Sequence, residues 1–424
     1  MSARLLAVVL ATACGLPLPA AEAPDLLATV SDAPQVEAAR KRIDAALARV
    51  GTAGRLADPE IEAMGSRVSG GAMGEDRDMW ELTVRQPLPR RGEREADRAR
   101  AGAAVTLAEA EYALVAGELA AEVAMALAEA DGADARLRLI RTQRDRMEVV
   151  LQTIEARLAS GLAPRIADRL TVQSRLAAMD LMLEETRRQA EDARADARGR
   201  LALAPDAPLP GFAAPAAAEI HAADAATVAV ADARAAEAGA MGRMARAGGR
   251  PMTAVGVRFE RERSSRGNQD TIGLALSSEI PWRGRGYARA GARAAEAERA
   301  AAQADGSAAR HRIASALARV ARAERVAATA RRLAGETQRR LDAEHDALTG
   351  AASAGAIGGG MGGESAVLHA VDILDQSTAT QLQIVEAETS ARVARAELWR
   401  YVPARRLLPG GTPVSIAESP TPSP

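Results

Sequence analysis

Residues 86–92 read Gln-Pro-Leu-Pro-Arg-Arg-Gly, and residues 278–284 read Ser-Glu-Ile-Pro-Trp-Arg-Gly. Both segments place a glycine three positions after a proline, and the later pair follows the earlier one by 192 residues (281 − 89 and 284 − 92). A proline further upstream repeats at the same offset (251 − 59). The repeated pairs are Pro59 and Pro251, Pro89 and Pro281, and Gly92 and Gly284. A constant offset at three anchors indicates that the chain contains two copies of one unit.

The segment between the two prolines of each copy alternates apolar and polar residues. In the first copy Trp80, Leu82 and Val84 alternate with polar residues, whereas residues 60–69 alternate poorly. In the second copy residues 255–260 and residues 272–277 both alternate. Period-two patterning with one apolar face predicts β-strands. We therefore expect one strand hairpin over residues 59–89 and a second over residues 251–281.

Each strand hairpin is followed by a very long stretch without proline. The first runs from Gly92 to about Leu158, and the second from Gly284 to Leu348. Each would be roughly 100 Å long as a continuous helix. Glycine-containing segments at 160–164 and 350–363 then break the pattern, and apolar residues at near-heptad spacing predict returning helices over 166–203 and 366–401. The second turn carries an extra glycine-rich segment at 351–362.

These boundaries predict a mainly α fold with a small β part, built as a duplicated repeat. Each repeat would open with a helix and continue with a strand hairpin and a long antiparallel helical hairpin. In chain order we expect a signal sequence (1–23), a first repeat (24–203, helical hairpin 92–203), a Pro- and Ala-rich linker (204–218), a second repeat (219–402, helical hairpin 284–402) and a disordered tail (403–424).

The N-terminus has the pattern of a secretory signal. Arg4 precedes an apolar run over residues 5–13, and small residues continue to Ala23. The single cysteine, Cys14, stands inside this segment. Cleavage before Cys14 would leave a lipidated first residue, as in bacterial lipoproteins, whereas cleavage near Ala20 would discard the cysteine. No later stretch is long and apolar enough for a membrane-spanning helix, so β-strands would carry any membrane insertion.

Composition excludes several classes of protein. The formal net charge is −1, which does not suggest the basic face that nucleic-acid binding needs. Aromatic residues are 2% of the chain, too few for ordinary globular cores. His345 and His369 flank the second turn, but the four histidines of the chain lack metal-ligand spacing. No nucleophile–base pair or nucleotide-binding loop is present, so we expect no enzyme, no cofactor and no metal site.

This order of motifs resembles the outer-membrane efflux proteins of the TolC type, especially the branch that serves exporters of metals and small molecules. The resemblance covers about residues 33–403. The segments that carry it are 33–39, 56–60, 86–89, 161–168, 280–281 and 372–376. It implies a homotrimer in the outer membrane whose four strands per chain close a 12-stranded β-barrel, continued into the periplasm by an α-helical barrel. Such a protein is a passive exit duct whose partners are outer-membrane lipid, a periplasmic adaptor (membrane fusion protein) and an inner-membrane pump.

The resemblance also implies where the duct would narrow. Asp372 and Asp375, with Asp168 at the first turn, would line a constriction at the periplasmic end. Carboxylates repeated around a narrow pore attract cations and repel one another. The same residues also suit solvated positions or helix caps.

Two further groups of residues have predicted roles. Gly161, Leu162 and Gly363 would present the helical tips to the adaptor. Trp80, Trp282 and Tyr287 stand at strand ends or junctions, where aromatic side chains anchor a barrel at the membrane interface; packing would explain them equally well. The alternatives to a duct are a periplasmic adaptor, which would carry one helical hairpin within β-rich domains, and a coiled-coil scaffold.

Overall fold

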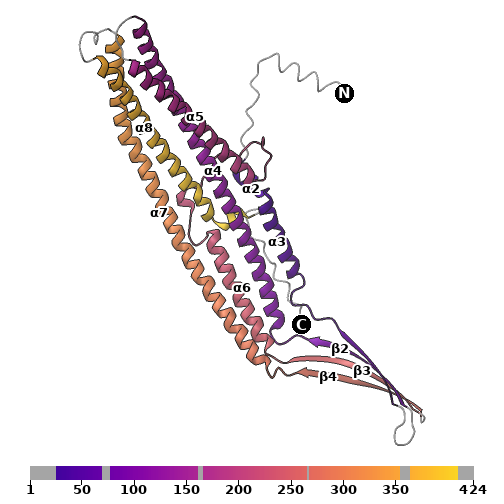
Figure 1. Cartoon of the computed structure of the whole chain (residues 1–424). Helices are drawn as coiled ribbons and strands as arrows, with labels where there is room; N and C mark the ends of the chain where they lie inside the picture. The colour runs from indigo at the N-terminus through magenta and orange to yellow at the C-terminus, as the bar shows by residue number, and fades with distance from the viewer. Residues whose placement is uncertain (1–24, 69–76, 161–165, 265–266, 354–362, 409–424) are drawn as a thin grey trace, which may run out of the picture. The chain divides into compact units, whose positions relative to one another are not determined.

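The computed structural model describes residues 25–68, 77–160, 166–264, 267–353 and 363–408. The predicted signal sequence with Cys14, the tip residues Gly161 and Leu162, and residues 409–424 lie outside this part. The described residues form long helices and one small antiparallel sheet (Figure 1). The predicted class, mainly α with a small β part, is confirmed.

The elements follow the predicted order. The strands are β1 (Glu60–Val68), β2 (Arg77–Leu88), β3 (Met252–Ser264) and β4 (Gly267–Glu279). The long helices are α4 (Glu93–Ala159), α5 (Ile166–Arg200), α7 (Gly284–Ser353) and α8 (Gly363–Ala396). The shorter helices are α2 (Leu26–Ser31), α3 (Pro34–Val50), α6 (Ala226–Gly248) and α9 (Ala404–Leu407), with 3-10 turns η1 (Ala217–Glu219) and η2 (Glu397–Tyr401).

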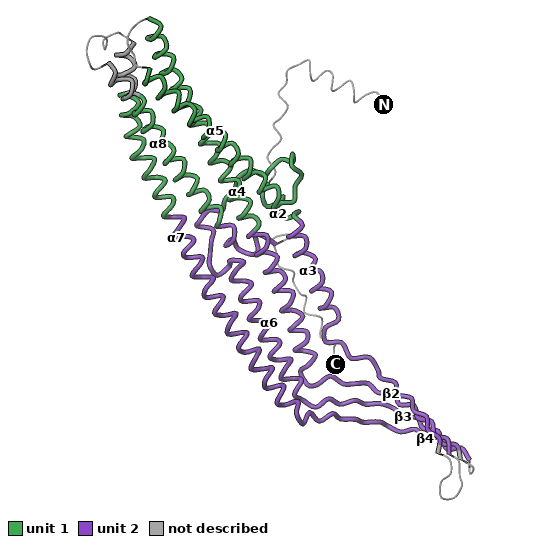
Figure 2. Tube along the Cα trace, viewed as in Figure 1, with its two compact units in different colours: residues 1–33, 119–214, 322–397 green, residues 34–118, 215–321, 398–424 purple. Residues whose placement is uncertain are grey.

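The described chain divides into two compact units that cut across the sequence repeats (Figure 2). Unit 1 comprises residues 1–33, 119–214 and 322–397, and unit 2 comprises residues 34–118, 215–321 and 398–424. The helices α4 and α7 each contribute their first part to unit 2 and the rest to unit 1. Each unit therefore combines residues of both predicted repeats.

The sheet belongs to unit 2 and has the order β1-β2-β3-β4, antiparallel throughout. Val84 of β2 pairs with Ile61 of β1 on one side and with Val257 of β3 on the other. Val257 in turn pairs with Leu274 of β4. The pairing of β2 with β3 joins the two hairpins into one sheet. The first strand alternates poorly in sequence, yet β1 spans nearly all of the stretch expected for it.

The junction between β2 and α4 depends on Gly92, whose φ of +79° is strained for any residue with a side chain. The following helix begins with a reciprocal cap, because Arg90 N–H donates to Glu93 Oε2 at 2.7 Å and Glu93 N–H donates to Arg90 O at 2.9 Å. Arg90 Nε also donates to the carbonyl oxygen of Arg250, at 3.0 Å, where β3 is about to begin. This bond joins the two predicted repeats at the base of the sheet.

The helices of unit 2 pack closely because their facing residues are small. Ala231, Ala238 and Ala240 of α6 and Ala295 and Ala302 of α7 are buried. A Cβ added at Gly242 of α6 would lie 3.4 Å from the Cβ of Ala295. The high alanine content therefore serves close packing of long helices.

The core of unit 1 is a cluster of larger apolar residues from three helices. Its members from α4 are Ile140, Met147, Val150 and Ile154, those from α5 are Val172 and Met179, and those from α8 are Val371 and Leu374. Burying such side chains contributes about 1.5–3 kcal/mol each, which holds α8 against the α4–α5 hairpin. None of the helices in the described part of the chain combines the length and the apolar character needed to cross a membrane.

The structure differs from the sequence boundaries at several helix ends. The first return helix ends at Arg200, before the expected residue 203, and Ala202 adopts a φ of +53° as the chain turns. The helix α8 ends at Ala396 and tightens into η2, where helix was expected to residue 401. At its far end, α7 extends to Ser353, into the glycine-rich insert.

Residues 403–408 are folded, although the sequence assigns them to a disordered tail. They include α9, in which Leu407 is buried. Arg406 pairs with Glu219, and its guanidinium carbon lies 5.5 Å from the centroid of the Trp399 ring. Backbone bonds from Ala226 N–H to Val402 O and from Ala404 N–H to Asp224 O attach this segment to the start of α6. Proline-rich composition failed to predict the segment because its order comes from these long-range contacts.

Candidate functional site

The four-stranded sheet has one apolar and one polar face. In the observed register Ala63, Leu82, Phe259 and Ile272 form one cross-strand row. The adjacent row on the same face consists of Ile61, Val84, Val257 and Leu274. In the isolated chain Leu274 is 93% exposed. An exposed apolar sheet face is costly in water but suited to hydrocarbon.

The opposite face carries charged and polar side chains. Arg258 Nη2 lies 2.9 Å from Glu81 Oε2 and 3.0 Å from Glu260 Oε2. Arg85 pairs with Glu62 on the same face. Ion pairs of this kind require water or polar surroundings rather than lipid. The two faces therefore have the alternation of a strand whose one side meets lipid and whose other side meets an aqueous interior.

The three aromatic residues singled out in the sequence border the apolar rows. Trp80 is close to the hairpin end of β2, and its ring lies over Gly65 of β1, where an added Cβ would be 3.4 Å away. Trp282 and Tyr287 lie at the other end, in the link from β4 to α7 and in the start of α7, and are 87% and 77% exposed. Aromatic girdles flank the apolar band of membrane barrels in this way. The interfacial role of these residues stays a prediction.

At the helical tip, the structure brings Asp375 of α8 together with Arg175 of α5. Arg175 Nε lies 3.3 Å from Asp375 Oδ2, and the Asp375 side chain is 30% exposed. Burial raises the pKa of Asp375 above its ordinary value; Arg175 lowers that pKa, and Asp372 raises it. Asp372 itself is exposed. Asp372 is thus close enough for its charge to act on the carboxyl group of Asp375.

The third predicted constriction residue, Asp168, has a different environment. It lies in the first turn of α5, where the helix N-terminus stabilises a carboxylate, and it is only 5% exposed. Among the residues that the structure describes, no hydrogen bond or ion pair joins Asp168 to Asp372 or Asp375. In this conformation Asp168 belongs to the packing of α5, and its place in a constriction stays a prediction.

The predicted docking residues are only partly covered. Gly161 and Leu162 fall between α4 and α5, outside the described residues, and Gly363 is the first residue of α8. Their adaptor-docking role stays a prediction. His369 Nε2 lies 3.1 Å from Glu344 Oε1. Within the described ranges, no group of three or more His, Cys, Asp or Glu side chains is placed to hold a metal ion.

Sequence analysis did not predict a group of buried and half-buried polar side chains that hydrogen-bond between helices of unit 1. Gln143 of α4 is 1% exposed, and its Nε2 donates to Gln381 Oε1 of α8 at 3.2 Å. Gln338 of α7 donates through Nε2 to the hydroxyl of Ser377 of α8 at 2.6 Å. A signal existed, because Gln143 stands at the heptad spacing between Ile140 and Met147. A polar residue in an apolar heptad stripe commonly sets the register of packed helices.

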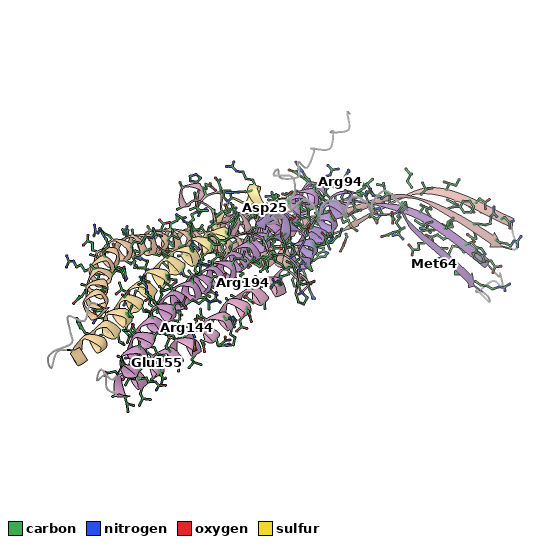
Figure 3. The ribbon with its side chains drawn as sticks, turned by 90° about the horizontal axis from the view of Figure 1, so that it is seen from above. Asp25, Met64, Arg94, Arg144, Glu155 and Arg194 are labelled. Carbon is green, nitrogen blue, oxygen red and sulfur yellow. The ribbon has the colours of Figure 1, made fainter. Side chains whose placement is uncertain are left out.

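Ion pairs also join the helices of unit 1. Arg144 Nε of α4 donates to Asp180 Oδ1 of α5 at 2.8 Å, and Arg194 of α5 pairs with Asp134 of α4 (Figure 3 labels both arginines). Between α7 and α8, Arg395 donates through Nε and Nη2 to Glu324 Oε1, at 3.0 and 2.7 Å. Exposed pairs contribute about 0–1 kcal/mol each, so they align the helices more than they stabilise them.

Comparison with known proteins shows the same combination of sheet and helices elsewhere. Residues 28–200 match the family described as outer membrane efflux protein. No curated protein matches the chain by sequence. Several solved structures have this fold over most of their length, and at their low identities they establish the fold alone.

Three solved structures illustrate the likeness. A membrane protein from Pseudomonas aeruginosa has a TM-score of 0.66 and 21% identity, with 89% of each chain covered. The outer membrane protein VceC of Vibrio cholerae has a TM-score of 0.66 and 16% identity, covering 89% of this chain and 95% of VceC. The MtrE outer membrane channel of Neisseria gonorrhoeae, in its open state, has a TM-score of 0.61 and 17% identity, covering 90% of this chain and 89% of MtrE.

The family concerned is one of channels rather than enzymes. Its sequence match covers the first helices, the first strand hairpin and the first helical hairpin, and the fold of the whole chain agrees with it. Residues 28–200 therefore match the outer membrane efflux protein family, and the chain as a whole has the fold of solved outer-membrane channels.

Proposed function

We propose that this chain is the outer-membrane channel subunit of a tripartite efflux system and a passive duct from the periplasm to the exterior. The observation that carries the proposal is the sheet, whose apolar face is exposed and whose polar face is charged. The strands β2 and β4 lead within a few residues into α4 and α7, which are 67 and 70 residues long. A helical conduit continuing a membrane-inserted sheet is what such a duct requires.

The proposed assembly is a homotrimer with a 12-stranded barrel. Within the described part of the chain the edge strands β1 and β4 each have one neighbour. A sheet inserted in lipid must close, because unpaired backbone groups in hydrocarbon cost several kcal/mol each. Three copies of a four-stranded sheet, each pairing β1 with β4 of the next copy, would satisfy every edge.

The proposed constriction lies at the second helical tip. Three copies of Asp372 and Asp375 would place rings of carboxylates around the axis, and the raised pKa of Asp375 is the behaviour expected of a partly buried member of such a ring. The tips at Gly161, Leu162 and Gly363 would meet a periplasmic adaptor, which links the duct to an inner-membrane pump. Asp168, in the first turn of α5, would stabilise the start of that helix beside the first tip.

The decisive experiment is to purify the full-length protein in gentle detergent and reconstitute it in planar bilayers. We expect a heat-modifiable trimer by native mass spectrometry and discrete cation-preferring conductance steps. A detergent-independent elongated monomer or dimer without conductance would instead identify a periplasmic scaffold or adaptor. Mass spectrometry of the mature N-terminus tests separately whether Cys14 is lipidated. An acylated residue 14 would identify Cys14 as a lipid anchor, whereas a mature chain that starts near Ala21 would lack Cys14.

A further inference from the structure

A groove of about 600 Å³ lies between the end of α6 and the start of α7, within unit 2. Its charged lining consists of Arg246 from α6 and of Arg285, Arg289, Arg293 and Glu296 from α7. Small residues, among them Gly249 at the end of α6, also line it. The groove therefore brings together four guanidinium groups and one carboxylate; we call it the arginine groove.

The arginines of this groove lack acidic partners. Arg285, Arg289 and Arg293 recur every fourth residue, so they stack along one side of α7, and like charges at this spacing destabilise a helix. In the described part of the chain none of the four guanidinium groups forms an ion pair. The Nε of Arg293 donates instead to the carbonyl oxygen of Arg289, at 3.5 Å. By contrast, Arg144 of α4 pairs with Asp180 of α5. The arginine groove is thus an uncompensated positive site.

The surroundings of the groove indicate which anion it would meet. The helix α7 begins five residues after β4 ends (284 − 279). Between and beside these ends Ile280, Trp282 and Tyr287 are exposed. Exposed aromatic residues next to arginines, at the end of an apolar sheet face, have the composition of a membrane–water interface. The N-terminus of α7 adds partial positive charge at the same place.

We propose that the arginine groove binds the phosphate of an anionic phospholipid headgroup in the periplasmic leaflet of the outer membrane. This inference rests on the proposed function, which places the junction of β4 and α7 at that leaflet. Guanidinium groups bind phosphate oxygens in pairs of parallel hydrogen bonds. A groove of this volume is within the range of about 300–1,000 Å³ typical of small-molecule sites.

The charge of the groove selects between lipid headgroups. Phosphatidylcholine carries a quaternary ammonium beside its phosphate, which four arginines would repel, whereas phosphatidylglycerol carries only the negative charge. Trp282 and Tyr287 would contact the glycerol and upper acyl region, which a free phosphate ion does not have. The site is therefore specific for an anionic lipid rather than for phosphate in solution.

The test uses the full-length channel in nanodiscs that contain equal amounts of phosphatidylglycerol and phosphatidylcholine. Native mass spectrometry after detergent release counts the lipids retained per trimer. We expect wild type to retain phosphatidylglycerol in preference to phosphatidylcholine. In the triple variant R285Q/R289Q/R293Q the ratio of retained phosphatidylglycerol to phosphatidylcholine should fall by about tenfold or more, since each basic side chain adds to the attraction for an anionic lipid. The matched control R312Q/R322Q/R332Q removes three other exposed arginines of α7 and should keep the preference.

Several outcomes would overturn the assignment. Equal retention of both lipids by wild type, or an unchanged preference in the triple variant, refutes lipid binding at the groove. Complete displacement of phosphatidylglycerol by inorganic phosphate at constant ionic strength identifies a free-anion site instead. If the triple variant does not assemble, the single variant Arg289→Gln must still weaken the preference. Failure of wild type to insert or conduct refutes the proposed function itself, whereas a conducting wild type without lipid preference refutes this inference alone.

Discussion

Arg175 and Asp375 form an ion pair between α5 and α8, with 3.3 Å between Nε and Oδ2. The pair joins the return helices of the two predicted repeats. Partial burial raises the pKa of Asp375, and Arg175 opposes that rise. An arginine on another helix therefore favours the charged form of Asp375 against the effect of burial.

Replacing Arg175 with glutamine should raise the pKa of Asp375 further, because the opposing positive charge is lost. In planar bilayers the midpoint at which acid reduces cation conductance should move to higher pH. The folded-state pKa of Asp375 lies above its ordinary value, so its contribution to stability is present below the unfolded pKa and is lost as the pH rises through the folded pKa. In the variant the pKa of Asp375 is higher still, so this contribution to stability should persist to a higher pH.

The matched control is Arg169→Gln, on the same helix, which removes an ion pair 3.5 Å long with Glu155 and does not touch Asp375. Its conductance midpoint should equal that of wild type. Identical midpoints in Arg175→Gln and wild type would mean that Asp375 does not set the pH response.

Replacing both Asp372 and Asp375 with asparagine should remove the fixed negative charge of the proposed constriction. We expect loss of cation preference and weaker block by divalent cations in single-channel recordings. Assembly should persist, because the buried neighbours Val371 and Leu374 are unchanged. The control Asp180→Asn removes a carboxylate of α5 that pairs with Arg144. Unaltered selectivity in the double variant would place the narrowest point elsewhere.

The variant Gly132→Ala should destabilise unit 1. An added Cβ at Gly132 of α4 would lie 3.0 Å from Thr389 Cβ of α8 and closer still to both γ atoms of Thr389. Such overpacking costs about 1–3 kcal/mol, which exceeds the gain of about 1 kcal/mol in helix propensity. Thermal unfolding in detergent should show a lower midpoint.

The control for this variant is Gly335→Ala in α7, where an added Cβ meets nothing within 4 Å. Here only the propensity gain acts, so the unfolding midpoint should stay or rise. The double variant G132A/T389A should recover part of the loss. Equal midpoints for Gly132→Ala and Gly335→Ala would show that α4 and α8 do not approach closely at this point.

Replacing Leu274 with arginine should impair membrane insertion, because Leu274 lies on the apolar sheet face. A basic residue at the lipid midplane of a barrel costs about 2–4 kcal/mol. The control Thr271→Arg lies on the opposite, charged face beside Glu260 and should insert normally. Folding into lipid vesicles, followed by the heat-dependent shift on gels, measures both variants. Normal insertion of Leu274→Arg would contradict a lipid-facing role for this side of the sheet.

The sequence predicted the elements better than the contacts between them. Alternation at Trp80, Leu82 and Val84 predicted β2, and the absence of proline after Gly92 and Gly284 predicted two helices of extreme length, because both signals are local. The partner of Asp375 was not predictable, since it depends on the register of α5 against α8, helices almost 200 residues apart in sequence. The heptad position of Gln143 indicates burial, but its partner Gln381 lies on α8 and was not predictable for the same reason.

The pairing of β2 with β3 has a consequence for biogenesis. Leu88 pairs with Thr253, which follows it by 165 residues (253 − 88), so the sheet cannot be completed until most of the polypeptide has been synthesised and exported. Until then the first hairpin exposes an open strand edge beside an apolar face, the arrangement most prone to aggregate. Contacts of such long sequence separation also form slowly. We therefore expect that a chaperone must bind the nascent subunit until the sheet is complete. If the chain is divided into its two predicted repeats, we expect a channel only when both halves are expressed together.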